Sequence, residues 1–202
     1  MNYLIELINF IFNLNQMKNR CGWAGKEEIY VKYHDEEWGV PVREDAKQFE
    51  FLILETFQAG LSWITILRKR ENFRQAFDQF DYKKIARYNE AKIQSLLENE
   101  GIIRNRLKVR ATVTNAQAFM KVQEEFGSFT EYIWGFVDGK PVNEKRKALS
   151  EVPATNEISD RLSKDLKKRG FKFVGSTVVY AHLQATGLIN DHVTDCFRHK
   201  EV

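Results

Sequence analysis

The chain has 202 residues, a net charge of +3 and 43% apolar residues. This length allows one large domain or two small ones, with a core that needs no disulfides for stability. Its two cysteines, near opposite ends, exclude a disulfide-rich secreted scaffold and are typical of a reducing compartment, so a cytoplasmic location is expected. The mild basicity is compatible with nucleic-acid binding but does not require it.

The first 18 residues form an apolar extension that Glu6, Asn9 and Asn13 interrupt. It is too short and too polar to span a bilayer and lacks the basic start and cleavage site of a signal peptide, so no membrane partner is expected. Two interpretations stay open: an amphipathic accessory helix, or a stretch translated from an upstream start codon ahead of a natural start at Met17. The second is favoured, which leaves residues 19–202 as the single domain.

The body of the chain predicts one helix after another, each with helical apolar spacing and a capping or stop residue. The expected elements are a helix over 30–37 closed by Gly39 and Pro41, a helix from the cap Asp45 to Phe57, a helix from the cap Ser62 through Trp63 to Gln79, two short helices capped by Asp81 and Asn89, a long helix over 105–126, and an aromatic helix after a capping box at Ser128.

Residues 139–156 are polar and rich in helix breakers, which predicts an exposed connection. No segment alternates apolar and polar residues between hairpin turns, so a sheet is not expected. The sequence therefore predicts a compact all-α protein.

A basic turn follows the helix that should end at Arg169, with Gly170 as its stop. The next helix should begin near Ser176 or Thr177. Because its glycines allow close approach and the second helix offers free N–H groups, this turn could hold a phosphate. The candidate DNA-binding residues are Lys168, Arg169, Gly170, Lys172 and Gly175, and a second basic group comprises Arg104, Arg106, Lys108 and Arg110. The alternative is an ordinary solvated charged face, which is the interpretation preferred for Arg68, Lys69 and Arg70.

Cysteine and histidine could form a metal site. His192 and Cys196 have the i,i+4 spacing that stacks an imidazole and a thiol on one helix face, and Cys21 and His34 could complete a four-ligand set. Zinc favours such ligands. Alternatively, the cysteines are small buried hydrophobes and the histidines are hydrogen-bonded core or surface groups. The spacing from Cys21 to His34 is longer than in common zinc fingers, so both possibilities stay open.

Several blocks, in order, resemble the DNA-3-methyladenine glycosylase I family of the helix-hairpin-helix superfamily: RCGWAG, YHDEEWGVP, LETFQAGLSWITILRKRENFRQAF, EGIIRNRLKV, EFGSF and SKDLKKRGFKFVGSTVVYAHLQATGLINDH. The resemblance runs from Arg20 to Cys196. It implies a helix-hairpin-helix glycosylase fold and one structural zinc ion, held by Cys21, His34, His192 and Cys196, that joins the N- and C-terminal regions.

The resemblance also implies an activity. A monomeric, monofunctional enzyme without lyase activity would flip N3-methyladenine out of alkylated double-stranded DNA and hydrolyse its N-glycosidic bond, leaving an abasic site and free N3-methyladenine. The methylated base is a cationic leaving group that needs little acid catalysis, so the enzyme must mainly supply a pocket for it.

The family's base-recognition residues fall on Glu55, Tyr33 and Trp63, with Tyr30, Trp23 and Trp38 nearby. Aromatic faces attract a cation, and a carboxylate among apolar neighbours can accept both the charge and the exocyclic amine. Glu55 is also the candidate catalytic residue, through electrostatics and not as a general base. From the residues alone, Glu55 would be a helix-surface group and the tryptophans would be core.

Three further points qualify the resemblance. Thr56 and Phe57 stand where many relatives have a glycine, which predicts a bulkier pocket wall. Asp191 is interpreted as a helix cap or a partner of the metal site, because the family lacks a catalytic aspartate. A DNA-binding module without chemistry would keep the turn and the metal ligands but would not need Glu55 and Trp63, whereas four protein ligands exclude a zinc hydrolase.

Overall fold

The computed structural model describes residues 18–202 of the chain, so the alternatives for the N-terminal extension lie almost entirely outside the described residues. Within 18–202, no helix is long and apolar enough to cross a membrane.

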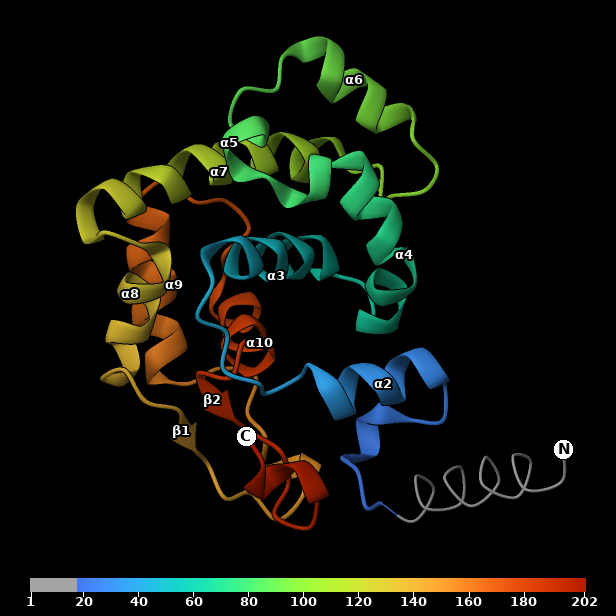
Figure 1. Cartoon of the computed structure of the whole chain (residues 1–202), viewed down its shortest axis with the longest axis vertical. Coiled ribbons are helices and arrows are strands. Elements are labelled where there is room, and N and C mark those ends of the chain that lie inside the picture. Colours follow the sequence, from blue (N-terminus) through green and yellow to red (C-terminus); the bar gives the residue numbers. More distant parts are fainter. Residues whose placement is uncertain (1–17) are drawn as a thin grey trace, which may run out of the picture.

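Helix α3 (Asp45–Gln58) lies at the centre of the molecule, as Figure 1 shows. Its residues from Gln48 to Phe57 are all buried, which is expected for a helix that is apolar on nearly every face. It packs against α4 (Trp63–Ala76), α7 (Arg106–Phe126), α8 (Phe129–Trp134) and α10 (Ser176–Ala185). The core is rich in phenylalanine: the Phe119 ring of α7 meets Phe49 of α3 edge-on and stacks on Phe129 of α8.

The other elements are short and surround this core. They are η1 (Gly22–Ala24), α2 (Glu28–Glu36), η2 (Asp78–Phe80), α5 (Tyr82–Ile85), α6 (Glu90–Glu98), η3 (Gly135–Val137), β1 (Val142–Asn143), η4 (Leu149–Glu151), α9 (Glu157–Lys168), β2 (Ile189–Asn190) and η5 (Phe197–Lys200). The predominantly helical fold class is confirmed. The departure is a two-residue parallel pairing of β1 with β2, which is too short to leave an alternating pattern in the sequence.

Most predicted caps lie where the sequence places them. The side chains of Asp81, Asn89, Asn105 and Ser128 each accept a backbone N–H of the helix that follows. Ser62 precedes α4 as expected, although its hydroxyl pairs with the Thr65 hydroxyl and not with the backbone.

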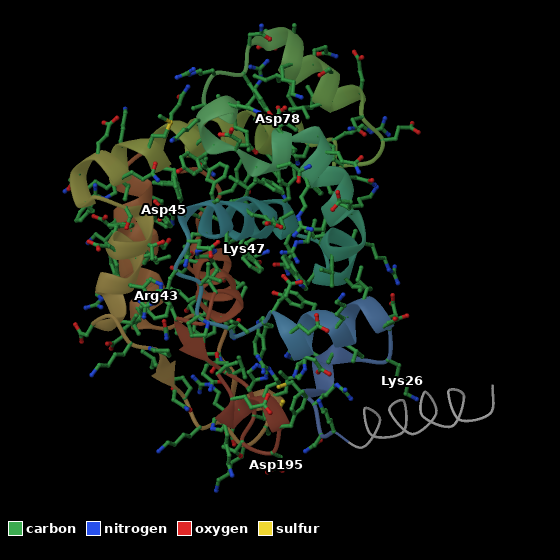
Figure 2. The ribbon with its side chains drawn as sticks, in the orientation of Figure 1. Lys26, Arg43, Asp45, Lys47, Asp78 and Asp195 are labelled. Atoms are coloured by element: carbon green, nitrogen blue, oxygen red, sulfur yellow. The ribbon has the colours of Figure 1, made fainter. Side chains whose placement is uncertain are left out.

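The predicted cap at Asp45 is wrong. Glu44 occupies the N-cap position of α3, and Asp45, labelled in Figure 2, is its first residue. The Asp45 carboxylate accepts the backbone N–H groups of Phe129 and Thr130 instead, so it caps α8. Local sequence cannot reveal such a cap, because the helix it serves begins more than 80 residues later.

Arg70 was expected on a solvated face, and this too is wrong. Its side chain on α4 is buried, and it donates to both carboxylate oxygens of Glu37, at 2.9 and 2.8 Å, and to Glu50 at 2.7 Å. Arg70 therefore joins α4 to α3 and to the end of α2. Arg68, its neighbour, is exposed and pairs with Glu27, as the solvated-face interpretation predicts.

Candidate active site and metal centre

The ends of several helices enclose a pocket of about 230 Å³. All six residues proposed for base recognition line it, namely Trp23, Tyr30, Tyr33, Trp38, Glu55 and Trp63. The remaining lining residues were not predicted for the pocket from the sequence; they are Gln58, Leu149, Val152, Ala181, Gln184 and Asp191. Ala181 and Gln184 share one face of α10, but only the fold reveals that this face meets the pocket.

Helix geometry explains how the aromatic side chains converge. Tyr30 and Tyr33 are three residues apart on α2 and so lie on the same helix face. Trp63 is the first residue of α4, and its ring centroid lies 5.3 Å from that of Tyr33. Trp23 lies 5.1 Å from Tyr30 and 4.8 Å from Trp38, the latter ring meeting it edge-on. The result is an aromatic enclosure whose ring faces can attract a cation.

Glu55 lies within this enclosure, on the last turns of α3. Its side chain is only 3% exposed, and its Oε2 atom has no hydrogen-bond partner among the described residues. Burial raises the pKa of Glu55 to about 8, because the low-dielectric surroundings disfavour the charged form. An unpaired buried carboxyl is costly for a protein to maintain, so it points to a ligand that carries donors or positive charge.

Two other polar groups of the pocket are buried beside Glu55. The indole Nε1 of Trp63 is buried without a partner in the described part of the chain. The pKa of Tyr33 is raised well above its usual range, first by burial and then by the nearby Glu55 carboxylate. The pocket therefore combines an apolar lining with a few polar atoms that await a partner.

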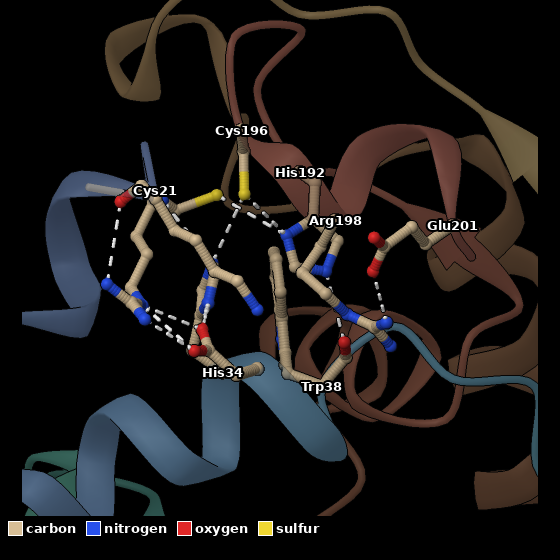
Figure 3. Close-up of polar contacts among 10 residues, drawn as sticks. Cys21, His34, Trp38, His192, Cys196, Arg198 and Glu201 are labelled. Atoms are coloured by element: carbon tan, nitrogen blue, oxygen red, sulfur yellow. Dashed lines mark hydrogen bonds and ion pairs between the residues drawn. The ribbon is translucent and has the colours of Figure 1, made fainter. Parts of the chain in front are cut away.

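Beside the pocket, Cys21, His34, His192 and Cys196 are all buried, and their donor atoms lie within 4.8 Å of one another. Figure 3 shows this cluster. The Cys21 Sγ lies 3.5 Å from His192 Nδ1, and the Cys196 Sγ lies 3.5 Å from both His34 Nε2 and His192 Nδ1. Tetrahedral zinc, with Zn–S near 2.3 Å and Zn–N near 2.0 Å, requires S···N separations of about 3.5 Å. The donor set therefore fits a four-coordinate metal ion.

The far nitrogen of each histidine in this cluster also has a partner. His34 Nδ1 lies 2.8 Å from the Asp35 carboxylate, and Arg20 donates to both oxygens of that carboxylate. His192 Nε2 lies 3.1 Å from the carbonyl oxygen of Trp38. Such contacts fix the tautomer and the ring orientation of a metal-ligating histidine.

The helix predicted for His192 and Cys196 is wrong. Residues 191–196 lie between β2 and η5 without helical structure. The two side chains still meet, because the backbone turns here and the Cys196 N–H donates to the Val193 carbonyl oxygen at 2.8 Å. The i,i+4 spacing of His192 and Cys196 therefore correctly predicts that the two side chains lie close together, but a turn and not a helix brings them together.

The basic turn lies between α9, which ends at Lys168, and α10, which begins at Ser176, as the sequence predicts. Gly170 has a φ of +95° and forms the stop. The buried Asn115 of α7 clamps the backbone of Lys172, accepting its N–H and donating to its carbonyl oxygen. Gly175 is the N-cap of α10 and supplies no side-chain cap, so the first N–H groups of α10 remain available to an anion.

The basic side chains around this turn differ in availability. Lys168 and Lys172 are exposed. Arg169 is engaged within the fold, because it pairs with Glu125 and Asp165 and lies over the Phe126 and Tyr132 rings.

Lys108, expected in the second basic group, does not face solvent. It is buried, and its Nζ donates to the carbonyl oxygens of Phe57 and Ala59 at 2.8 and 2.6 Å. It therefore caps the C-terminal end of α3, where a cation is favourable.

Within residues 18–202, Asp191 neither caps a helix nor has a hydrogen bond to a metal-ligand side chain. Its buried carboxylate accepts hydrogen bonds from Arg146, Tyr180 and Gln184. It lines the pocket, next in sequence to His192.

Comparison with known proteins gives consistent matches. The family model described as methyladenine glycosylase matches residues 23–199. DNA-3-methyladenine glycosylase 1 of Escherichia coli (strain K12) is 48% identical over 177 residues, which cover 88% of this chain and 95% of the relative. A crystal structure of 3-methyladenine DNA glycosylase I superimposes with a TM-score of 0.87 at 49% identity, covering 89% of this chain and 98% of the other. A variant of such an enzyme, solved in complex with 3-methyladenine, gives a TM-score of 0.86 at 37% identity, covering 89% and 96%.

Proposed function

This chain belongs to the methyladenine glycosylase family, and we propose that it excises N3-methyladenine from alkylated duplex DNA by hydrolysing the N-glycosidic bond. The observation that carries the proposal is Glu55: a buried, unpaired carboxyl group inside an aromatic enclosure. The methylated base brings one positive charge and an exocyclic amine. Glu55 can accept both, and the rings stack on the base and stabilise its charge by roughly 0.5 to 2 kcal/mol per good contact.

Base flipping explains why the pocket must bind strongly. Extruding a nucleotide costs a few kcal/mol, least for a damaged base, and the pocket recovers this through stacking and hydrogen bonds. Entry of the cation favours the ionised form of Glu55, so its proton leaves as the base binds. The pocket thereby selects a cationic base over a neutral one.

The chemical step needs little from the protein. A water oxygen forms the new bond to C1′ of the deoxyribose and gives up one proton to the solvent, while the glycosidic bond breaks and its electron pair neutralises the departing base. Glu55 contributes electrostatically in this scheme. Asp191 is an unsuitable general base, because three donors already occupy its carboxylate.

Cys21, His34, His192 and Cys196 are the ligands we assign to a structural zinc ion. Zinc supplies no chemistry to the reaction here, since four protein ligands leave no position for water. Its role is to stabilise the contact between the N-terminal segment and the C-terminal segment of the domain. Two buried thiols and two buried imidazoles are the soft and borderline donors that zinc favours.

The turn between α9 and α10 serves, in this proposal, as the hairpin of a helix-hairpin-helix motif that binds a DNA phosphate. Lys168, Lys172, Gly170, Gly175 and the first N–H groups of α10 are its contacts, with Arg169 as a supporting residue. Such contacts do not depend on sequence, which suits a monomeric enzyme that searches duplex DNA for rare damage.

A DNA-binding module without chemistry is the second candidate. It would need the hairpin and the metal site but not a buried acid among aromatic rings, so the intact pocket favours the enzyme. Titration of the metal-loaded protein with free N3-methyladenine and with adenine tests this directly, with tryptophan fluorescence as the readout. We expect saturable quenching by N3-methyladenine and much weaker binding of adenine. A folded protein that binds DNA but neither base would favour the module.

A further inference from the structure

One wall of the pocket comes from the connection between β1 and α9. Leu149 and Val152 of this connection line the pocket together with the aromatic residues. Leu149 is 48% exposed, and η4, which contains it, has no buried residue. A segment with so little buried apolar surface has low local stability, so a few specific contacts must determine its position.

Arg146 makes several such contacts, including an ion pair between its Nη2 and Glu144 Oε2 at 3.2 Å. Its Nε donates to Asp191 Oδ1 at 2.8 Å, and its Nη1 donates to the Glu151 carbonyl oxygen at 2.9 Å. The Arg146 carbonyl oxygen accepts the Thr194 N–H at 2.8 Å. Arg146 thus connects the segment that carries Leu149 to the buried carboxylate of Asp191, the residue that follows β2. The Asp191 side chain is 0% exposed and Arg146 only 17%, so water competes weakly for this pair.

The pair also determines the charge of the pocket. Glu55 and Asp191 are the two carboxyl groups among the residues that line it. Asp191 has a cationic partner in Arg146, whereas no ion pair of Glu55 is found among residues 18–202. One carboxyl group therefore remains for the one positive charge of the ligand.

We propose that Arg146 is a positioning and specificity residue: through Asp191 it fixes Leu149 and Val152 against the flipped base and, among the described lining residues, leaves Glu55 as the one carboxyl group free to meet the base's charge. This inference rests on the proposed function, because it assumes that the pocket binds the methylated base. Arg146 itself does not touch the base.

The test is a double-mutant cycle on affinity for free N3-methyladenine, with Arg146→Met, Leu149→Ala and the double variant. Arg146→Met should weaken binding by about tenfold or more, the scale of one lost hydrogen bond between charged groups. Leu149→Ala alone should weaken it severalfold. The double variant should be no weaker than Arg146→Met, because a wall that is no longer fixed gains nothing from Leu149. Arg161→Met, an exposed arginine of α9 that donates to the Phe136 carbonyl oxygen, is the matched control and should bind as the wild type does.

Affinity for undamaged duplex DNA separates this role from a general loss of structure. It should change less than twofold in every variant, roughly within the scatter of additive surface changes. Strictly additive effects in the cycle, or wild-type affinity in Arg146→Met, would overturn the inference. If Arg146→Met fails to fold, Leu149→Ala is the deciding variant, because this exposed side chain contributes little to stability. An unchanged affinity of Leu149→Ala for N3-methyladenine would show that Leu149 does not contact the base and would overturn the inference. Failure of the wild type to bind N3-methyladenine would instead refute the proposed function.

Discussion

The Nε2 atom of His192 lies 3.1 Å from the carbonyl oxygen of Trp38, and the two rings meet edge-on with centroids 4.5 Å apart. Trp38 lines the pocket, so a metal-site histidine and the pocket wall are in direct contact. Gly39 allows this approach: it has a φ of +84°, and a Cβ there would lie 2.9 Å from the same nitrogen. The Trp23 ring likewise lies 5.2 Å from the His34 ring, edge-on. Loss of the metal should therefore affect both stability and the pocket.

Cys196→Ser should remove the metal and lower thermal stability, because a hydroxyl is a poor zinc ligand and the remaining thiol and imidazoles lose their shared cation. We expect less than one zinc ion per ten chains, roughly, by elemental analysis and a melting temperature lower by more than about 5 °C. Thr194→Ser, which changes a nearby residue of the same segment without removing a donor, is the control. Unchanged zinc content in Cys196→Ser would contradict the site.

Glu55→Gln should weaken binding of free N3-methyladenine while affinity for undamaged duplex DNA stays nearly constant. The amide keeps the size of the side chain but is a weaker acceptor than a carboxylate for the exocyclic amine of the base, so the loss should be about tenfold to a hundredfold, as for a charged hydrogen bond. Calorimetric titration with each ligand measures both affinities. Equal losses for base and DNA would instead assign Glu55 a structural role.

Stability should depend on pH through Glu55. Its pKa rises from the ordinary 4.5 to about 8 on folding, so the folded state holds one more proton than the unfolded state between these values. The proton on Glu55 therefore makes its full contribution to the free energy of unfolding below pH 4.5. This contribution is lost as the pH rises towards 8, and the loss is about a few kcal/mol at most. The melting temperature of wild type minus that of Glu55→Gln, measured at pH 5, 6.5 and 8, should fall across the series. A constant difference would mean that Glu55 is not buried in its neutral form.

Substitution of Lys172 should affect DNA binding, whereas substitution of Lys108 should affect stability. Lys172→Ala removes an exposed charge at the proposed hairpin, so DNA affinity should fall and the dependence of log affinity on log salt should become shallower by about one unit. Lys108→Met removes the cap of α3, so it should lower stability by about 1 to 3 kcal/mol without changing that slope. Fluorescence anisotropy at several salt concentrations, with denaturant unfolding beside it, distinguishes them. A shallower slope in Lys108→Met would restore Lys108 to the DNA-binding surface.

The sequence predicts best what is encoded locally. The caps Asn89 and Asn105, the stop at Gly170 and the start at Ser176 were all placed to within a residue, because each depends on a few adjacent residues. The aromatic residues and Glu55 could be assigned to one pocket through the resemblance, and the fold does bring them together.

Hydrogen-bond and ion-pair partners that are far apart in the chain could not be predicted from the sequence, for a physical reason. Asp45, Arg70 and Lys108 carry charges that are usually solvated, and only the assembled helices show that each has a specific acceptor or donor and that Arg70 and Lys108 are buried. The same holds for Arg146 and Asp191, which are 45 residues apart. Residues 139–156 were expected to be merely an exposed connection, yet Leu149 and Val152 from this segment form part of the pocket.

The measurement that tests the central claim most directly is base release from alkylated DNA. Duplex DNA treated with dimethyl sulfate is incubated with the metal-loaded protein, and every free base is identified by mass spectrometry, with Glu55→Gln in parallel. We predict release of N3-methyladenine without N7-methylguanine, and a much slower release by Glu55→Gln. If a folded, zinc-loaded protein that binds DNA releases no base, the glycosylase assignment is contradicted and the non-catalytic module takes its place.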